Sequence, residues 1–247
     1  MKKMFLLLVL SLFICGNLFA ADFSLSAGAG GLLGAFFTRY ESSSSSGDMS
    51  MTQKVDQLNY GALVFFDASY AELSVLIQSG SNSYDEVMVR DDDDGPDFVA
   101  RTGDGWETML GFCLLGKYPF TLTKKLTLFP LLGIEYQIAL SEKRRVNQGI
   151  IYDRTNGIYE KDANGNSFDI STWNAFWIHV GVGTDIALAK SFFIRSELLY
   201  SFRLMTAYES DGLEQMKSML NDNDPKLSGL TSGPSLRLCA GYRFFKL

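Results

Sequence analysis

The sequence predicts an all-β fold: an eight-stranded antiparallel up-and-down transmembrane β-barrel. Two patterns in its 247 residues support this prediction. Apolar residues recur at every second position in eight separate runs, as they do in strands with one apolar and one polar face. The connections between the runs alternate between long polar segments and short turns, an asymmetry that membrane barrels show. The predicted barrel therefore has four long external loops and three short periplasmic turns.

In each of the first four runs, every second residue is mainly apolar. They are Asp22–Tyr40, Gln57–Phe66, Ala71–Ile77 and Trp106–Leu114. In chain order the alternating residues are Phe23, Leu25, Ala27, Ala29, Leu33, Ala35 and Phe37; Leu58, Tyr60, Ala62, Val64 and Phe66; Ala71, Leu73, Val75 and Ile77; and Trp106, Thr108, Leu110, Phe112 and Leu114. The tight connection 67–69 joins the second and third runs, so we expect these two strands to pair antiparallel.

The last four runs repeat the pattern. They are Leu126–Ile138, Phe176–Ile186, Phe192–Phe202 and Ser235–Leu247. Their alternating residues are Leu126, Leu128, Pro130, Leu132, Ile134, Tyr136 and Ile138; Phe176, Ile178, Val180, Val182 and Ile186; Phe192, Ile194, Leu198, Tyr200 and Phe202; and Leu236, Leu238, Ala240, Tyr242 and Phe244. Pro130 lacks an N–H for a strand ladder, so we expect a bulge or a broken pair there.

The opposite phase of these runs holds their ionisable side chains. We predict that a polar network in the barrel lumen consists of Glu72, Glu107, Glu135, His179, Asp185, Arg195, Glu197, Arg203, Arg237 and Arg243. Asp185 and Arg195 are about equally far from the turn between their runs, which makes them expected cross-strand partners. A soluble sandwich would also segregate charge, but aromatic residues near the ends of the apolar phase and glycines in the charged phase favour a narrow membrane barrel.

The N-terminal segment predicts export. Residues 1–20 combine Lys2 and Lys3 with an apolar stretch and small residues at the end, as a signal peptide does, and we expect cleavage near Ala20 or Ala21. Residues 21–247 would then form one barrel domain. The alternatives are a retained anchor, for which the apolar stretch is shorter than the roughly 20 residues of a spanning helix, and a lipoprotein site at Cys15, which lacks small residues before the cysteine.

The long connections contain two further patterns. Asn156 and Gly157 lie between short strand-like runs and predict a hairpin in the third loop. Asp211 is a candidate N-cap for a short amphipathic helix in the fourth, with disorder as the open alternative.

Other functional classes find little support. The net charge of −6 argues against nucleic-acid binding. His179 is the only histidine, and its own run offers no nearby serine for a hydrolase, so we expect no enzyme and no cofactor. The stretch Arg90–Asp97 resembles a calcium loop at a few positions, but Arg90 occupies the first ligand position, and we expect a solvated acidic loop without a metal.

The chain resembles the small eight-stranded outer-membrane β-barrels of the OmpA, OmpX, OmpW and opacity-protein types. The resemblance rests on the architecture, the signal peptide and the terminal AGYRF, with Gly241, Tyr242 and Phe244 at positions of a C-terminal assembly signal. It implies the outer membrane as location, with outer-membrane lipid, the barrel-assembly machinery and periplasmic chaperones as partners, and a monomer. Phe245, Lys246 and Leu247 extend beyond the usual terminal aromatic residue.

Two functions remain at this point. The first is a structural or interaction role, adhesin-like or in envelope integrity, with surface loops that contact a host or extracellular ligand. The second is an OmpW-like passage for small, mostly hydrophobic solutes, which apolar residues in the lumen phase favour: Leu63, Phe65, Met109, Leu115, Phe129 and Leu131. We also expect Cys113 and Cys239 to stay unpaired, because the fourth and eighth strands lie on opposite walls of the barrel.

Overall fold

The computed structural model describes residues 23–43, 49–92, 95–146, 149–153, 174–204 and 226–246. The predicted signal peptide, the Asn156–Gly157 turn, the Asp211 helix and the centre of the acidic loop lie outside these residues. The strands are β1 (Ser24–Ser43), β2 (Met49–Asp67), β3 (Ala71–Asp92), β4 (Gly95–Lys117), β5 (Phe120–Thr123), β6 (Leu126–Val146), β7 (Gly149–Asp153), β8 (Ala175–Ala187), β9 (Phe192–Arg203) and β10 (Lys226–Lys246).

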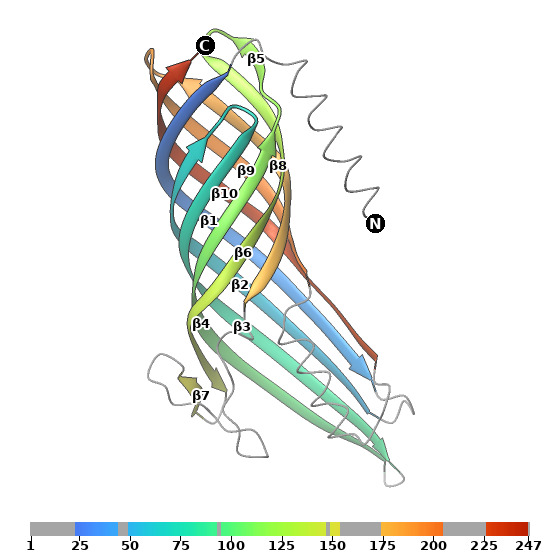
Figure 1. The fold of residues 1–247 in the computed structure, drawn as a ribbon. Coiled ribbons are helices and arrows are strands. Elements are labelled where there is room, and N and C mark those ends of the chain that lie inside the picture. Colours follow the sequence, from blue (N-terminus) through green and yellow to red (C-terminus); the bar gives the residue numbers. More distant parts are fainter. Residues whose placement is uncertain are drawn as a thin grey trace, which may run out of the picture.

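Eight of these strands close into a ring, which confirms the predicted fold class. The order around the ring is β1-β2-β3-β4-β6-β8-β9-β10, and β10 pairs with β1 so that all neighbours are antiparallel (Figure 1). The short strands β5 and β7 each add to β6 outside the ring. Closure leaves the barrel without a free edge, as a membrane-spanning sheet requires.

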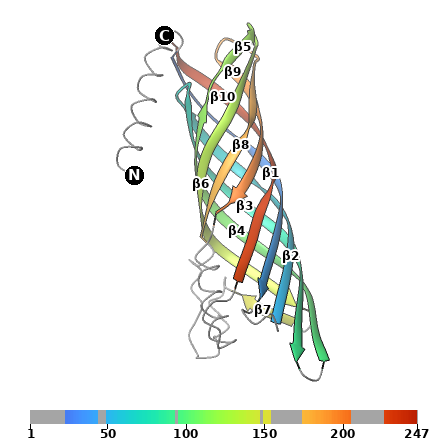
Figure 2. The same cartoon turned by 90° about the vertical axis from the view of Figure 1, so that its right-hand side faces the viewer.

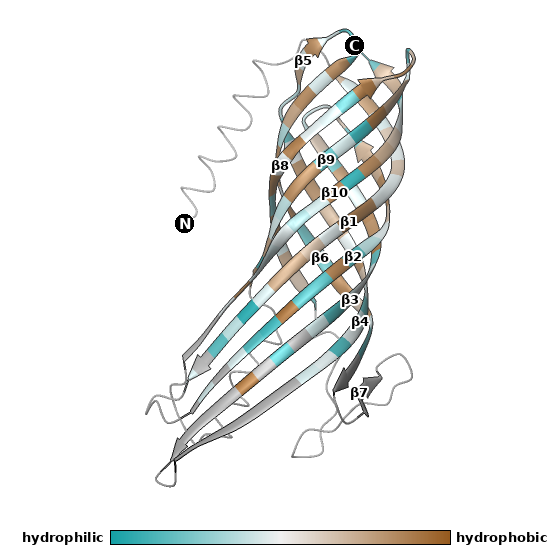
Figure 3. Cartoon of the chain, turned by 180° about the vertical axis from the view of Figure 1, so that it is seen from behind, coloured by the Kyte–Doolittle hydropathy of each residue, from teal (hydrophilic) through white to brown (hydrophobic). Residues whose placement is uncertain are grey.

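The apolar phase of every strand faces outward. Val64, Leu132 and Val182 expose 57%, 65% and 51% of their surface, whereas ionisable residues of the other phase, such as Glu72, Asp185 and Arg195, are buried. Figure 3 shows the apolar and polar residues alternating along the strands. An apolar exterior around a polar interior is the arrangement of a transmembrane barrel. The described residues include no helix that is long and apolar enough to cross a membrane.

Aromatic side chains form contacts near both ends of the apolar exterior. Toward the loops, the Tyr60 and Trp106 rings lie 5.9 Å apart between centroids, and Tyr136 and Phe176 lie 4.8 Å apart. The turn end carries other ring pairs, among them Phe66–Phe244 at 6.1 Å and Phe192–Tyr242 at 5.0 Å. These positions suit side chains that sit at the boundary between lipid and water.

Much of the first two predicted loops is strand. Residues 41–43 pair with 50–52, and the β3–β4 ladder runs from Ala71↔Gly116 to Asp92↔Gly95. A backbone ladder can continue beyond the membrane without a sustained alternating apolar phase for a sequence pattern to detect, and here residues 87–89 and 98–100 are short consecutive apolar runs. In the third loop, β7 pairs antiparallel with residues 143–146 of β6.

The barrel wall is therefore taller on one side. β4 continues through Gly95–Thr102 beyond its last pair with β6, and β10 continues through Lys226–Leu230 beyond its last pair with β9. The strands β10, β1, β2, β3 and β4 form a sheet that leans away from the barrel at its loop end (Figure 1, Figure 2). We call the loop-end part of this sheet, beyond the last β4–β6 and β10–β9 pairs, the wall extension.

Pro130 interrupts one of its two ladders, as predicted. Its pairing with Val182 of β8 is in register, without a bulge. On the other side, the β4–β6 ladder ends at Lys117↔Leu131, and the β5–β6 ladder starts at Phe120↔Leu128. The missing N–H thus coincides with the gap between two partner strands.

A register shift occurs in β10 next to the predicted assembly signal. Leu25 pairs with Phe245 and Ser26 with Arg243, so Phe244 is the extra residue of a bulge. Phe244 and Phe245 are consequently both exposed, while Arg243 stays in the lumen phase. The bulge explains how the strand continues beyond the terminal aromatic residue without turning its apolar side chains inward.

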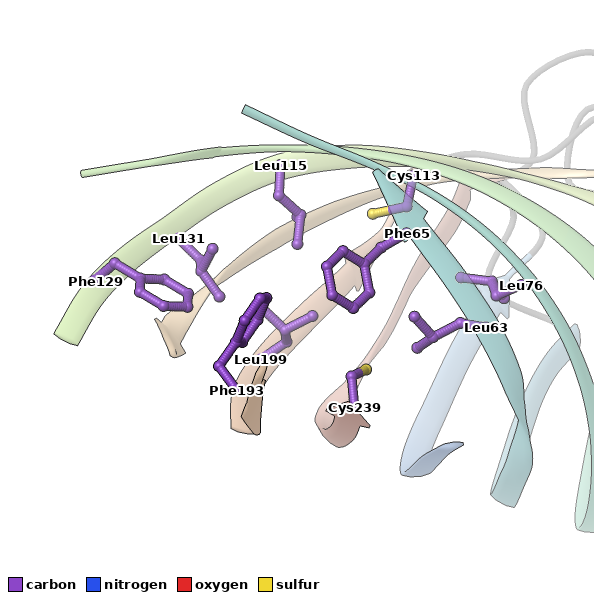
Figure 4. Packing of buried hydrophobic residues seen from close by; sticks show 10 residues of the cluster. All are labelled: Leu63, Phe65, Leu76, Cys113, Leu115, Phe129, Leu131, Phe193, Leu199 and Cys239. Carbon is purple, nitrogen blue, oxygen red and sulfur yellow. The ribbon is translucent and has the colours of Figure 1, made fainter. Parts of the chain in front are cut away.

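The lumen contains a packed apolar cluster. Its members are Leu63, Phe65, Leu76, Cys113, Leu115, Phe129, Leu131, Phe193, Leu199 and Cys239 (Figure 4). Cys113 and Cys239 are both free and enter the cluster from the opposite walls β4 and β10, as the strand order predicts.

Three phenylalanine rings of this cluster each lie over a glycine of the neighbouring strand. The directly paired residues are Gly28↔Phe65, Phe129↔Gly183 and Gly241↔Phe193. A Cβ on Gly183 would lie 2.1 Å from Cε2 of Phe129, and a Cβ on Gly241 would lie 2.2 Å from Cζ of Phe193. The lumen-phase glycines therefore make the space that the aromatic rings fill.

We expect Gly183→Ala to destabilise the barrel by about 1 to 3 kcal/mol, because the added methyl group displaces the Phe129 ring. Gly31→Ala is the matched control, since its Cβ would face outward with one contact, at 3.6 Å from the Gly61 carbonyl oxygen. Folding into lipid vesicles is measured as a function of urea concentration, and the gel migration of unheated samples reports the folded fraction. Equal stability of the two variants would contradict the packing argument.

We expect Val182→Arg to cost about 2 to 4 kcal/mol, because its outward position in the middle of the apolar exterior places a charge in lipid. Val182→Leu keeps an apolar side chain there and is expected to cost less than about 1.5 kcal/mol. The same folding measurement compares the two variants. A tolerated arginine would show that this face is not lipid-exposed.

Candidate functional site

A buried arginine organises the turn end of the lumen. Arg195 is 1% exposed, and its Nε and Nη2 donate to the two carboxylate oxygens of Asp185 at 2.7 and 2.8 Å. The two residues are directly opposite on β8 and β9, as predicted from their distances to the turn. Arg195 also forms ion pairs with Asp67 at 2.5 Å and with Glu72. One guanidinium thus contacts three carboxylates from three different strands.

The aromatic rings over the glycines surround the same guanidinium. The Cζ atom of Arg195 lies 4.8 Å from the centroid of Phe65, and 5.2 Å from those of Phe129 and Phe193. Cation–π attraction is strongest where water is excluded, as it is here. The rings and the carboxylates together replace the hydration that the cation loses on burial.

Asp67 and Lys117 complete this Arg195 cluster and were not among the residues predicted for the network. Lys117 forms an ion pair with Asp67, and its Nζ lies 4.9 Å from the Phe129 ring centroid. From the sequence, Asp67 belonged to the tight connection after the second run, whereas Lys117 already fell in the charged phase of the fourth. β2 extends one step further than its apolar phase indicates, which turns Asp67 into the lumen.

A second polar cluster lies further toward the loop end, around Arg237. Its Nη2 donates to Glu135 at 3.2 Å, and its Nη1 lies 3.9 Å from Glu197, the residue directly opposite on β9. Trp177 donates to Gln137 at 2.8 Å, and Gln137 donates to Glu135 at 2.6 Å. These contacts form a continuous hydrogen-bonded chain across the lumen.

His179 belongs to this Arg237 cluster. Its Nδ1 lies 2.7 Å from Oγ of Ser201, and its Nε2 lies 3.2 Å from a carboxylate oxygen of Glu135. The sequence indicated no serine near His179 along its own strand, but the adjacent strand β9 supplies one. Ser201 is 0% exposed, and Glu135 is already bound by Arg237 and Gln137. The Ser201 hydroxyl is therefore not accessible from solvent in this arrangement.

Cys113, Glu135 and His179 also bring three potential metal ligands within 4.8 Å of one another. The guanidinium of Arg237 contacts two of them, at 3.6 Å from Sγ of Cys113 and 3.2 Å from Glu135. A cationic side chain therefore already occupies ligand atoms that a metal ion would need, which disfavours a metal centre at these residues.

The remaining predicted network residues lie outside both clusters. Glu107 accepts a hydrogen bond from Gln57, and Arg203 donates to the Tyr40 hydroxyl, both toward the loop end. Arg243 lies at the turn end, with its Cζ 5.6 Å from the Phe193 ring centroid. The structure thus separates the ten predicted residues into an Arg195 cluster, an Arg237 cluster and three individual positions.

Comparisons with known proteins find similarity in fold. No family model matches the sequence, and no curated protein matches it. The structure is similar to the outer membrane protein OprG of Pseudomonas aeruginosa, with a TM-score of 0.44, 11% identity, and coverage of 90% of this chain and 95% of that one. The attachment invasion locus protein Ail of Yersinia pestis has a TM-score of 0.30 at 13% identity, with coverages of 90% and 99%. The outer membrane protease OmpT of Escherichia coli has a TM-score of 0.31 at 8% identity, with coverages of 93% and 98%.

We expect Arg195→Gln to destabilise the barrel by about 3 to 5 kcal/mol, because it leaves three buried carboxylates without their shared cation. Arg39→Gln is the control: Arg39 pairs with Asp56 at 3.0 Å, but both side chains are about half exposed, and such pairs contribute about 0 to 1 kcal/mol. Folding into lipid vesicles measures both. Similar values for the two variants would refute the organising role of Arg195.

Proposed function

We propose that this outer-membrane β-barrel is a closed scaffold that displays its wall extension to molecules outside the cell. The observation that carries the proposal is the packed lumen. Side chains with almost no exposed surface fill the lumen beside the two polar clusters, among them Leu115, Leu199 and Phe129. An eight-stranded barrel is just wide enough to be filled in this way. A filled barrel acts on its surroundings through its surfaces.

The wall extension supports the display role. The β3–β4 hairpin continues beyond the last β4–β6 pair for Gly95–Thr102, or roughly 25 Å along the strand. Its described polar residues include Asp85 and Asp104, both exposed. A hairpin held in register with β2 presents side chains on a firmer support than a free loop does, which lowers the entropic cost of binding a partner.

Passage of small hydrophobic solutes is the alternative function. The six apolar residues that favour it are all buried, between 0% and 7% exposed. Five of them, all but Met109, belong to the packed cluster that also contacts the Arg195 guanidinium. A path for solutes would open only if these side chains moved apart while the ion pairs of Arg195 stayed intact. This alternative therefore has less support than display.

We expect the purified protein to produce no stepwise conductance in planar bilayers and no uptake of hydrophobic solutes into vesicles. Arg195→Gln serves as the comparison, because loss of the central cation loosens the packed lumen. Stepwise conductance or solute uptake by the wild-type barrel would support passage and contradict the closed scaffold.

We expect a cysteine at Asp85 to react with a membrane-impermeant maleimide on intact cells, and a cysteine at Lys190, in the β8–β9 turn, to react only after permeabilisation.

In the same cells, the hairpin tip 87–100 is replaced by Asn-Gly, which preserves the pairing of the remaining residues. Attachment of cells to matrix-coated surfaces should fall with this variant while its folding is unchanged. Labelling of Lys190→Cys on intact cells, or attachment independent of the hairpin, would contradict display.

A further inference from the structure

A cavity of about 310 Å³ lies at the turn end of the lumen, next to Arg195. Hydroxyl groups contribute much of its lining, including those of Ser24, Ser26 and Thr127. Thr121 and Lys246 at its rim are exposed, so the cavity is accessible from solvent at this end. Its volume is at the lower end of the range for small-molecule sites.

Arg243 lines this cavity, and its side chain has no polar partner within the part of the chain that the structure describes. Its backbone N–H donates to the carbonyl oxygen of Ser191 at 2.7 Å, which fixes the residue in place. Its guanidinium contacts the Phe193 ring, and its Nε is buried without a hydrogen-bond partner among the described residues. A buried donor without an acceptor is costly, and a charged donor more so. The guanidinium is therefore poised to bind an acceptor.

The carboxylates nearby are already engaged. Both oxygens of Asp185 accept from Arg195, and Asp67 pairs with Arg195 and Lys117. Of the cationic side chains that line the cavity, Arg195 and Lys117 are paired with these carboxylates and with Glu72, whereas Arg243 forms no ion pair with a described residue. A cation without a paired carboxylate favours an anion over a cation as the occupant.

We propose that this cavity binds the oxyanion group of a small solute, a carboxylate or a phosphate, through the guanidinium of Arg243. The two-pronged arrangement of guanidinium N–H groups matches the oxygens of both groups. The surrounding hydroxyls supply further donors that do not require a charge. This site is separate from the wall extension and goes beyond the display function, because it faces the turn end of the barrel.

The test is calorimetric titration of the purified full chain in detergent micelles with inorganic phosphate and, separately, with sodium acetate. We expect saturable binding of one of the two anions or of both. Arg243→Gln should weaken that binding tenfold or more, as expected for loss of a charged hydrogen-bond pair. Arg39→Gln, at the exposed loop end, should bind as the wild type does.

Arg243→Lys provides a second variant that keeps the positive charge in the lumen and loses the two-pronged geometry. Its affinity is expected between those of the wild type and Arg243→Gln, with unchanged gel migration as the test of folding. Binding of phosphate alone would identify a phosphate-bearing solute, and binding of acetate alone a carboxylate. Absence of saturation by both anions, or wild-type affinity in both Arg243 variants, would overturn the proposal.

Discussion

The buried guanidinium of Arg195 is the feature on which the rest of this barrel depends. A charge as deeply buried as this one, with 1% of its surface exposed, would be prohibitively costly without partners. Three carboxylates and three aromatic rings, contributed by β2, β3, β6, β8 and β9, meet this requirement together. Their positions are compatible only when the strands are in their observed order and register. The cluster therefore joins five of the eight ring strands through a single buried side chain.

The glycines opposite the phenylalanines are the steric counterpart of this electrostatic requirement. A lumen of eight strands cannot hold three rings and an arginine at one level unless the facing positions lack side chains. Gly28, Gly183 and Gly241 provide that space through direct cross-strand pairing. On the outer face the side chains contact lipid, so the polarity of a side chain affects stability there more than its size does. Packing inside and polarity outside thus act on alternate residues of the same strands.

The alternation of apolar residues predicted the eight strands, their neighbours and the side that faces lipid, because this period directly reflects the pleat of a strand. It also predicted the Asp185–Arg195 pair, since a short turn determines register. It did not predict where strands end: the β3–β4 hairpin and the inward position of Asp67 depend on ladders that continue without an apolar phase. The same β8–β9 turn also places His179 opposite Ser201, although the prediction for His179 rested on its own strand alone. Contacts across the lumen, such as Arg195 with Glu72 and Arg237 with Glu135, depend on the closed shape and leave no local pattern.

The two ends of the molecule differ: the wall extension lies at the loop end and the cavity beside Arg243 at the turn end. The packed lumen separates them. The central claim is that Arg195 is held in that core by aromatic and carboxylate contacts. Nuclear magnetic resonance of the protein with ¹⁵N-labelled arginine in micelles tests this most directly. The account predicts a slowly exchanging Nε–H of Arg195 with nuclear Overhauser contacts to the rings of Phe65, Phe129 and Phe193. Rapid exchange with solvent and the absence of ring contacts would contradict it.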